Sequence, residues 1–123
     1  MKRLSILAAL ALLAAAPAMA REPIPPCDPG GWHQAPADCP LTVSFASYGP
    51  GIDQPTLVRV ERRLRTDRRA REVSRHRWGR EGEVTLCVRP RRAADVRRLA
   101  RELRAMIPAR PRGPVEVTVH RPR

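Results

Sequence analysis

Histidine, cysteine and aromatic side chains recur in segments where every second residue is apolar. His76 and Trp78 lie two positions apart, Cys87 follows a short turn, and Tyr48 ends an earlier alternating segment. Imidazole and thiolate groups are metal ligands, and aromatic rings offer contact area to a small molecule. These four side chains are therefore candidates for a ligand-binding face.

A metal or catalytic site built on these residues lacks partners. His76 and Cys87 fall diagonally across a predicted hairpin, about 7–8 Å apart at the backbone. His120 belongs to the opposite edge of the predicted sheet, roughly 14 Å from His76, whereas bonds to zinc are about 2.0–2.3 Å long. No Cys-x-x-Cys pair, Ser-His-Asp order, phosphate loop or pair of carboxylates stands out in the sequence. We expect no catalytic residue, no bound metal and no cofactor.

Basic side chains are the second kind of candidate. The chain has 24 Lys and Arg against 12 Asp and Glu, which gives a net charge of +12 at pH 7. Seven arginines project from two predicted helices, away from the apolar stripes: Arg59, Arg62, Arg63, Arg97, Arg98, Arg101 and Arg104. Guanidinium groups bind phosphates and carboxylates through paired hydrogen bonds. These arginines either attract a polyanion or form a solvated surface whose arginine content reflects codon bias.

Six predicted elements position both sets of residues. The hydrophobic periodicity predicts strand, helix, strand, strand, helix and strand, with bounds near 41–48, 54–67, 72–78, 83–89, 96–107 and 115–120. Asp53 can cap the first helix, and Pro108 ends the second. This β-α-β-β-α-β order, a split βαβ arrangement of the α+β class, resembles the ferredoxin-like superfold. Right-handed crossovers then give a four-stranded antiparallel sheet with both helices on one face.

The turn between the second and third predicted strands fixes their register. Four residues separate Trp78 from Glu83, so these two pair and the residues on either side pair in step. Arg75 and Arg77 then fall on the helix-covered face. An edge strand tolerates them because long side chains can reach water past its rim.

The chain is predicted to begin with a cleavable Sec signal peptide, residues 1–20. Lys2 and Arg3 precede an apolar run of about 13 residues, shorter than the roughly 20 needed for a membrane span. Cleavage after Ala20 would give a periplasmic or secreted protein with no membrane span. Residues 21–40 contain six prolines and form a predicted Pro/Gly-rich N-terminal arm, and residues 41–123 form the predicted ferredoxin-like domain.

Three cysteines in an oxidising compartment leave one of them unpaired. A Cys27–Cys39 disulfide closes a short loop inside the arm, and we prefer this pairing. Cys39–Cys87 is its rival, because the first strand begins beside the end of the third. With the preferred pairing, Cys87 is either buried under the arm or forms a disulfide-linked dimer.

Length and charge narrow the function without naming it. One small domain excludes a multidomain enzyme and a repeat protein. We expect a small exported, non-enzymatic, basic binding module of the bacterial envelope that contacts anionic polymers, lipids or an acidic protein. Export from the cytoplasm argues against nucleic acid as the partner. The alternative is a ligand- or metal-binding protein that uses the open face of the sheet.

Overall fold

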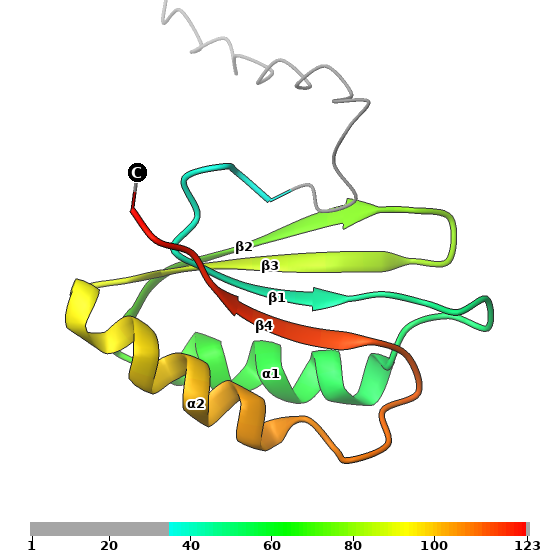
Figure 1. Cartoon of the computed structure of the whole chain (residues 1–123). Helices are drawn as coiled ribbons and strands as arrows, with labels where there is room; N and C mark the ends of the chain where they lie inside the picture. The colour runs from blue at the N-terminus through cyan, green and yellow to red at the C-terminus, as the bar shows by residue number, and fades with distance from the viewer. Residues whose placement is uncertain (1–34, 123) are drawn as a thin grey trace, which may run out of the picture.

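A four-stranded antiparallel sheet with two helices on one face forms the domain (Figure 1). The computed structural model describes residues 35–122, so the predicted leader and most of the predicted arm, Cys27 included, lie outside the described residues. The elements are β1 (Leu41–Phe45), α1 (Gln54–Thr66), β2 (Ala70–Trp78), β3 (Glu83–Pro90), the short 3-10 helix η1 (Ala93–Asp95), α2 (Val96–Met106) and β4 (Val115–Val119). The strand order is β2-β3-β1-β4. The predicted α+β, ferredoxin-like arrangement is confirmed.

The hydrophobic core lies between the sheet and the two helices. Alternate residues of β1 and β3, such as Val43 and Leu86, are completely buried on the helix-covered face. Leu57 and Leu64 of α1 and Leu103 of α2 close the core from below. α1 packs against β2, and α2 packs against β4. Within residues 35–122, no helix is long and apolar enough to cross a membrane.

The hairpin register agrees with the prediction at every position from Val73 to Trp78. Trp78 pairs with Glu83, and Arg75 and Arg77 pair with Leu86 and Val84. The four-residue turn contains two glycines with positive φ, Gly79 at 68° and Gly82 at 83°. The predicted placement of Arg75 and Arg77 on the helix side of the edge strand is therefore confirmed.

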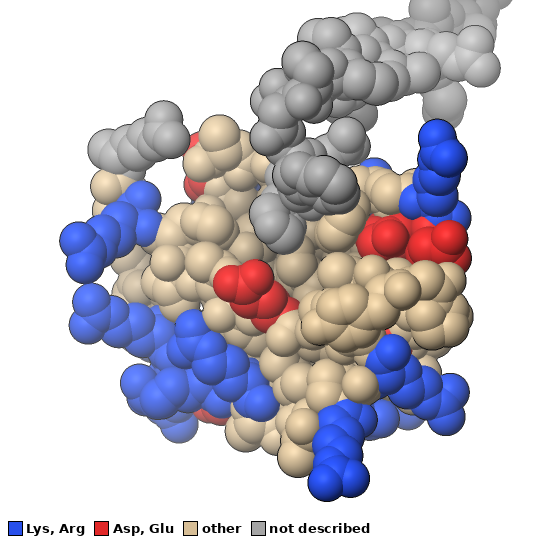
Figure 2. Space-filling view, turned by 45° about the vertical axis from the view of Figure 1, so that its right-hand side comes forward, with Lys and Arg blue, Asp and Glu red and all other residues tan. Residues whose placement is uncertain are grey.

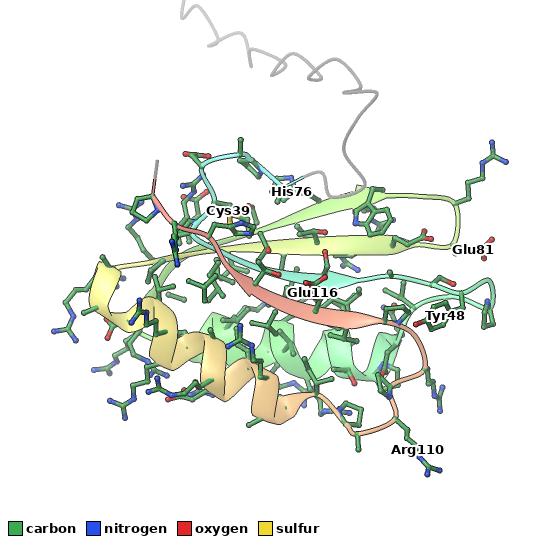
Figure 3. All side chains as sticks on the ribbon, in the orientation of Figure 1. Cys39, Tyr48, His76, Glu81, Arg110 and Glu116 are labelled. Atoms are coloured by element: carbon green, nitrogen blue, oxygen red, sulfur yellow. A yellow bond between two sulfur atoms is a disulfide. The ribbon has the colours of Figure 1, made fainter. Side chains whose placement is uncertain are left out.

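The first strand is shorter than predicted. It ends at Phe45. Ala46 still donates its N–H to Pro114 O at 2.9 Å, in register with the β1–β4 pairing, and the chain turns away after it. The Ser47 hydroxyl accepts hydrogen bonds from the N–H groups of Gly49 and Gly51 at 2.9 and 3.0 Å, which fixes this turn. Tyr48 therefore lies in the loop after β1 and not on the sheet, and 85% of it is exposed (Figure 3).

Asp53 begins α1 as predicted and also ties the helix to a distant loop. Its carboxylate accepts the N–H of Thr56 at 3.1 Å and the N–H of Arg112 at 3.2 Å. Burial would raise the pKa of Asp53, but these hydrogen bonds outweigh burial and lower the pKa. The cap thus joins the start of α1 to the segment that enters β4.

Candidate functional site

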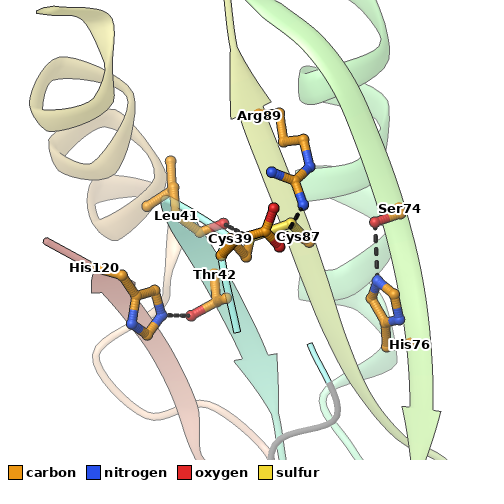
Figure 4. Close-up of a disulfide and its surroundings, with 9 residues drawn as sticks. Cys39, Leu41, Thr42, Ser74, His76, Cys87, Arg89 and His120 are labelled. Carbon is orange, nitrogen blue, oxygen red and sulfur yellow. Dashed lines mark hydrogen bonds and ion pairs between the residues drawn. A yellow bond between two sulfur atoms is a disulfide. The ribbon is translucent and has the colours of Figure 1, made fainter. Parts of the chain in front are cut away.

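Polar side chains on the open face of the sheet bond to one another. Ser44 and Thr85 share a hydrogen bond of 2.8 Å, and Trp78 Nε1 donates to the Thr85 hydroxyl at 3.0 Å. The hydroxyl of Thr42, on β1, and Nε2 of His120, just after β4, share a hydrogen bond of 2.9 Å (Figure 4). Ser74 and His76 are also joined at 2.9 Å, two strands away from that pair. The hydroxyl and imidazole groups are therefore spread across the face as local pairs.

The disulfide on this face joins Cys39 to Cys87, with 5.9 Å between their Cα atoms (Figure 4). The predicted Cys27–Cys39 pairing is wrong for Cys39. A hydrogen bond of 2.9 Å from Cys39 N–H to Pro36 O closes a turn within residues 35–40, and this turn lies over the open face. An ion pair of 2.9 Å between Asp38 and Arg89 holds the same turn.

The disulfide removes Cys87 from the predicted ligand set. A bonded sulfur is not a thiolate ligand, and the free Cys87 thiol on which a disulfide-linked dimer would depend is taken up by the bond to Cys39. Tyr48 has left the sheet, whereas His76 and Trp78 share the open face of β2. Among the described residues, no group of three or more His, Cys, Asp or Glu side chains could hold a metal ion.

The seven arginines predicted on the helices all lie on the outside of α1 and α2 and are exposed. Figure 2 shows basic side chains gathered at the lower left, where α2 lies, and along the lower edge. Arg59 donates to the Thr56 hydroxyl at 3.0 Å, and Arg104 donates to Val117 O at 2.9 Å.

Two acidic side chains of the helix layer, Glu102 and Asp67, meet at one seam between the helices. Glu102 of α2 contacts Arg69 at 2.5 Å, Arg63 at 3.2 Å and Arg98 at 3.4 Å. Asp67, just after α1, contacts Arg69 at 2.7 Å and Arg63 at 2.9 Å. We name these five residues the charged seam. Sequence reasoning missed it, although Asp67 and Arg69 stand two apart after the helix.

Hydrogen bonding at the seam favours the charged forms of Asp67, Glu102 and Arg69. The hydrogen bonds from Arg69, opposed only in part by burial, lower the pKa of Asp67 to about 2. Hydrogen bonding to Arg69 also lowers the pKa of Glu102. The same bonds raise the pKa of Arg69. Asp67 and Glu102 are thus both paired with arginines. In contrast, Arg62, Arg97 and Arg101 form no ion pair with any residue in 35–122.

The opposite side of the domain carries acidic groups. Glu116 projects from β4 on the open side of the sheet, and Glu81 lies in the β2–β3 turn (Figure 3). Glu72 and Glu83 belong to the same side through their positions on β2 and β3. Arg110, in the loop after α2, points away from the sheet on the helix side (Figure 3). Charge is therefore divided between the two sides of the domain.

Comparisons with known proteins assign no family to this chain. No protein-family model matches it, and no curated protein or solved structure matches it at a significant level. The chemistry of its own surfaces therefore carries the functional argument.

Proposed function

We propose that this protein is a small exported, non-enzymatic, basic binding module of the bacterial envelope, and that its helix layer binds an anionic surface. One observation carries the proposal: the acids of the charged seam are already shared among arginines, while Arg62, Arg97 and Arg101 stay exposed without a partner in the described part of the chain. The excess positive charge of the helix layer is therefore available to a ligand.

The arrangement of α1 and α2 suits an extended anion better than a small one. The two helices lie side by side beneath the sheet, so their outer arginines form a broad surface and not a pocket (Figures 1 and 2). Guanidinium groups bind phosphate and carboxylate oxygens in pairs. Lipid phosphates, an anionic polymer or an acidic protein surface all carry this chemistry at high density.

Two features support an envelope location for this activity. The first is the Cys39–Cys87 disulfide, because disulfides form and persist in oxidising compartments outside the cytoplasm. The predicted leader, which lies outside the described residues, would deliver the chain there. In the envelope the candidate ligands are lipid phosphates, lipopolysaccharide and acidic proteins, whereas nucleic acid is confined to the cytoplasm.

Binding to vesicles tests the proposal. We expect the protein to bind vesicles containing anionic phospholipid and immobilised heparin at low salt, and to dissociate as salt rises, because the Debye length is about 10 Å at 0.1 M. Arg97→Glu/Arg101→Glu should weaken vesicle binding by at least about thirtyfold, since each of the two arginines lost contributes about 1 kcal/mol near an anionic membrane and the two glutamates are repelled.

The matched control changes the same number of charges elsewhere. Arg80 lies in the β2–β3 turn and Arg121 follows β4, and both are exposed. Arg80→Glu/Arg121→Glu should weaken binding far less than the α2 double variant. Equal losses in the two double variants would show that net charge alone governs binding, and unchanged binding of the α2 variant would show that the helix layer is only a solvated surface.

A further inference from the structure

The two edges of the sheet differ in what they leave exposed. β4 has five residues, and Arg104 already donates to its Val117 carbonyl at 2.9 Å. β2 has nine residues and, within residues 35–122, only β3 as a strand neighbour. An edge strand presents unpaired N–H and C=O groups along its outer side. The longer edge is therefore the one with room for a further strand.

Charge along β2 is separated by face. Arg75 and Arg77 lie on the helix side of the strand, and exposed Arg71 stands at the register shift near its start. Arg75 contacts Glu61 of α1 at 3.6 Å, whereas Arg71 and Arg77 form no ion pair with any described residue. The other face of the same strand carries Glu72 and no arginine. In the second half of the strand, Arg75 and Arg77 thus alternate with Ser74, His76 and Trp78, whereas Val73 holds the preceding helix-side position.

From this pattern we infer that the outer edge of β2 binds an extended, acidic segment of another protein by strand addition. Backbone hydrogen bonds to the edge would supply affinity, and alternate side chains would supply specificity. Carboxylates at every second position of the segment would face Arg75 and Arg77, while the intervening side chains would lie on the side of Glu72. Lipid and polysaccharide have no peptide groups to add to a sheet, so this ligand must be a protein segment and differs from the lipid and polymer ligands proposed for the helix layer.

Self-association through the same edge is disfavoured by charge. Two copies of β2 paired edge to edge would bring arginines of one copy against arginines of the other, and like charges in that position repel. The arginines that would keep the edge from pairing with itself are those that would attract an acidic strand. The peptide experiment separates protection of the edge from recognition of a partner.

Synthetic peptides as long as β2 test the inference on the wild-type protein. The first has Asp at every second position with Thr between, and the second has the same composition with all Asp residues consecutive. Two further peptides repeat the alternating sequence with N-methyl groups on every second amide, in one frame or in the other. Fluorescence anisotropy of labelled peptide gives the dissociation constants.

Strand addition predicts a specific order of affinities. The alternating peptide should bind about tenfold more tightly than the block peptide, since it aligns two or three ion pairs. One N-methyl frame should abolish binding and the other should leave it unchanged, because only alternate amides of an added strand face the sheet. Equal binding of all four peptides, or no binding by any of them, would overturn the inference.

Variants locate the binding site. Arg71→Glu/Arg77→Glu should weaken binding of the alternating peptide about tenfold, and Arg97→Glu/Arg101→Glu, on the helix at the other edge of the domain, should change it less than about twofold. Circular dichroism checks that each variant is folded. If a variant is not folded, the peptide affinities measured on the wild-type protein still test the inference. Loss of peptide binding only in the α2 variant would overturn the β2 site. Vesicle binding of the β2 variant reports separately on the helix-layer proposal.

Discussion

The two faces of the sheet are built from the same four strands but are stabilised by different interactions. On the helix-covered face, Val43, Leu86 and Val88 are completely buried among aliphatic side chains. On the open face, Ser44 and Thr85 are also buried, but directional hydrogen bonds hold them. Apolar contact tolerates small shifts, whereas a hydrogen bond weakens steeply with distance and angle. The open face therefore relies more on exact geometry than the covered face does.

The outer surfaces repeat this division in charge. The helix layer carries exposed arginines around the charged seam, and the open side carries the exposed acids Glu72, Glu81 and Glu116. An anionic ligand thus meets attraction on one side of the domain and weaker attraction or repulsion on the other. The contrast teaches that alternation along the strands decides which side chains face the core, whereas helical spacing on α1 and α2 decides where most of the positive charge lies.

The largest effect is expected in the core under the covered face. Leu103 lies in the middle of the α2 stripe and is 1% exposed. Leu103→Ala should lower the free energy of unfolding by about 2–5 kcal/mol, because it leaves a cavity in a close-packed core. Urea denaturation measures the change. Arg101→Ala, on the outer face of the same helix, is the control and should stay within about 0.5 kcal/mol. Similar midpoints for the two variants would mean that the covered face is not the main source of stability.

The open face should respond next, through its disulfide. Cys39 and Cys87 are separated by 48 residues along the chain, so their bond restricts a large part of the unfolded ensemble. Replacing both with Ser should lower the free energy of unfolding by about 2–4 kcal/mol. The measurement is urea denaturation of the double variant against the parent chain.

Cys27→Ser is the control for this comparison and also tests the pairing. It removes the third cysteine while leaving the Cys39–Cys87 bond intact, so stability should not change. A loss of unfolding free energy for Cys27→Ser as large as that for the double variant would show that Cys27 takes part in the stabilising bond. Non-reducing peptide mapping of the parent chain identifies the linked cysteines directly.

Most of the fold could be predicted because its periodicities are uninterrupted. Leu99, Leu103 and Met106 keep helical spacing up to Pro108, and the Gly79–Gly82 turn fixes the hairpin register without long-range information. The end of β1 could not be predicted in the same way. Alternation continues to Tyr48 in the sequence, but the turn around the Ser47 hydroxyl takes the chain off the sheet after Ala46.

The candidate site was predicted less well, because its contacts are long-range. Sequence reasoning placed the outward arginines on their helices, yet it did not show that Glu102 and Asp67 converge from separate elements. The disulfide failed for a similar reason. A short loop favours Cys27–Cys39, and only the turn of residues 35–40 over the open face brings Cys39 to Cys87. Contacts that depend on where a loop turns leave little trace in local spacing.

The smallest effect is expected from the charged seam, which adds an electrostatic contribution outside both faces of the sheet. The hydrogen bonds from Arg69 lower the pKa of Asp67 to about 2, whereas the ordinary value is near 3.8. A lowered carboxyl pKa stabilises the folded state above the ordinary value, and this stability is lost as pH falls toward the folded value. Between about pH 4 and pH 2, Asp67 should therefore account for a loss of about 1 kcal/mol, after allowance for solvent screening.

Asp67→Asn isolates this contribution from the other carboxyl groups. Near neutral pH the variant should be less stable than the parent chain by about 1 kcal/mol. The difference should shrink as pH falls from about 4 toward 2 and vanish below that, where Asp67 is protonated in the folded parent as well. Glu116→Gln removes an exposed carboxylate that forms no ion pair with any residue of the described domain, and so controls for the loss of one negative charge. Urea midpoints at intervals across this pH range give the comparison. A constant difference between Asp67→Asn and the parent would mean that the seam acts through packing of its side chains. A difference that closes with acid means that it acts through the charge of Asp67 held between Arg63 and Arg69.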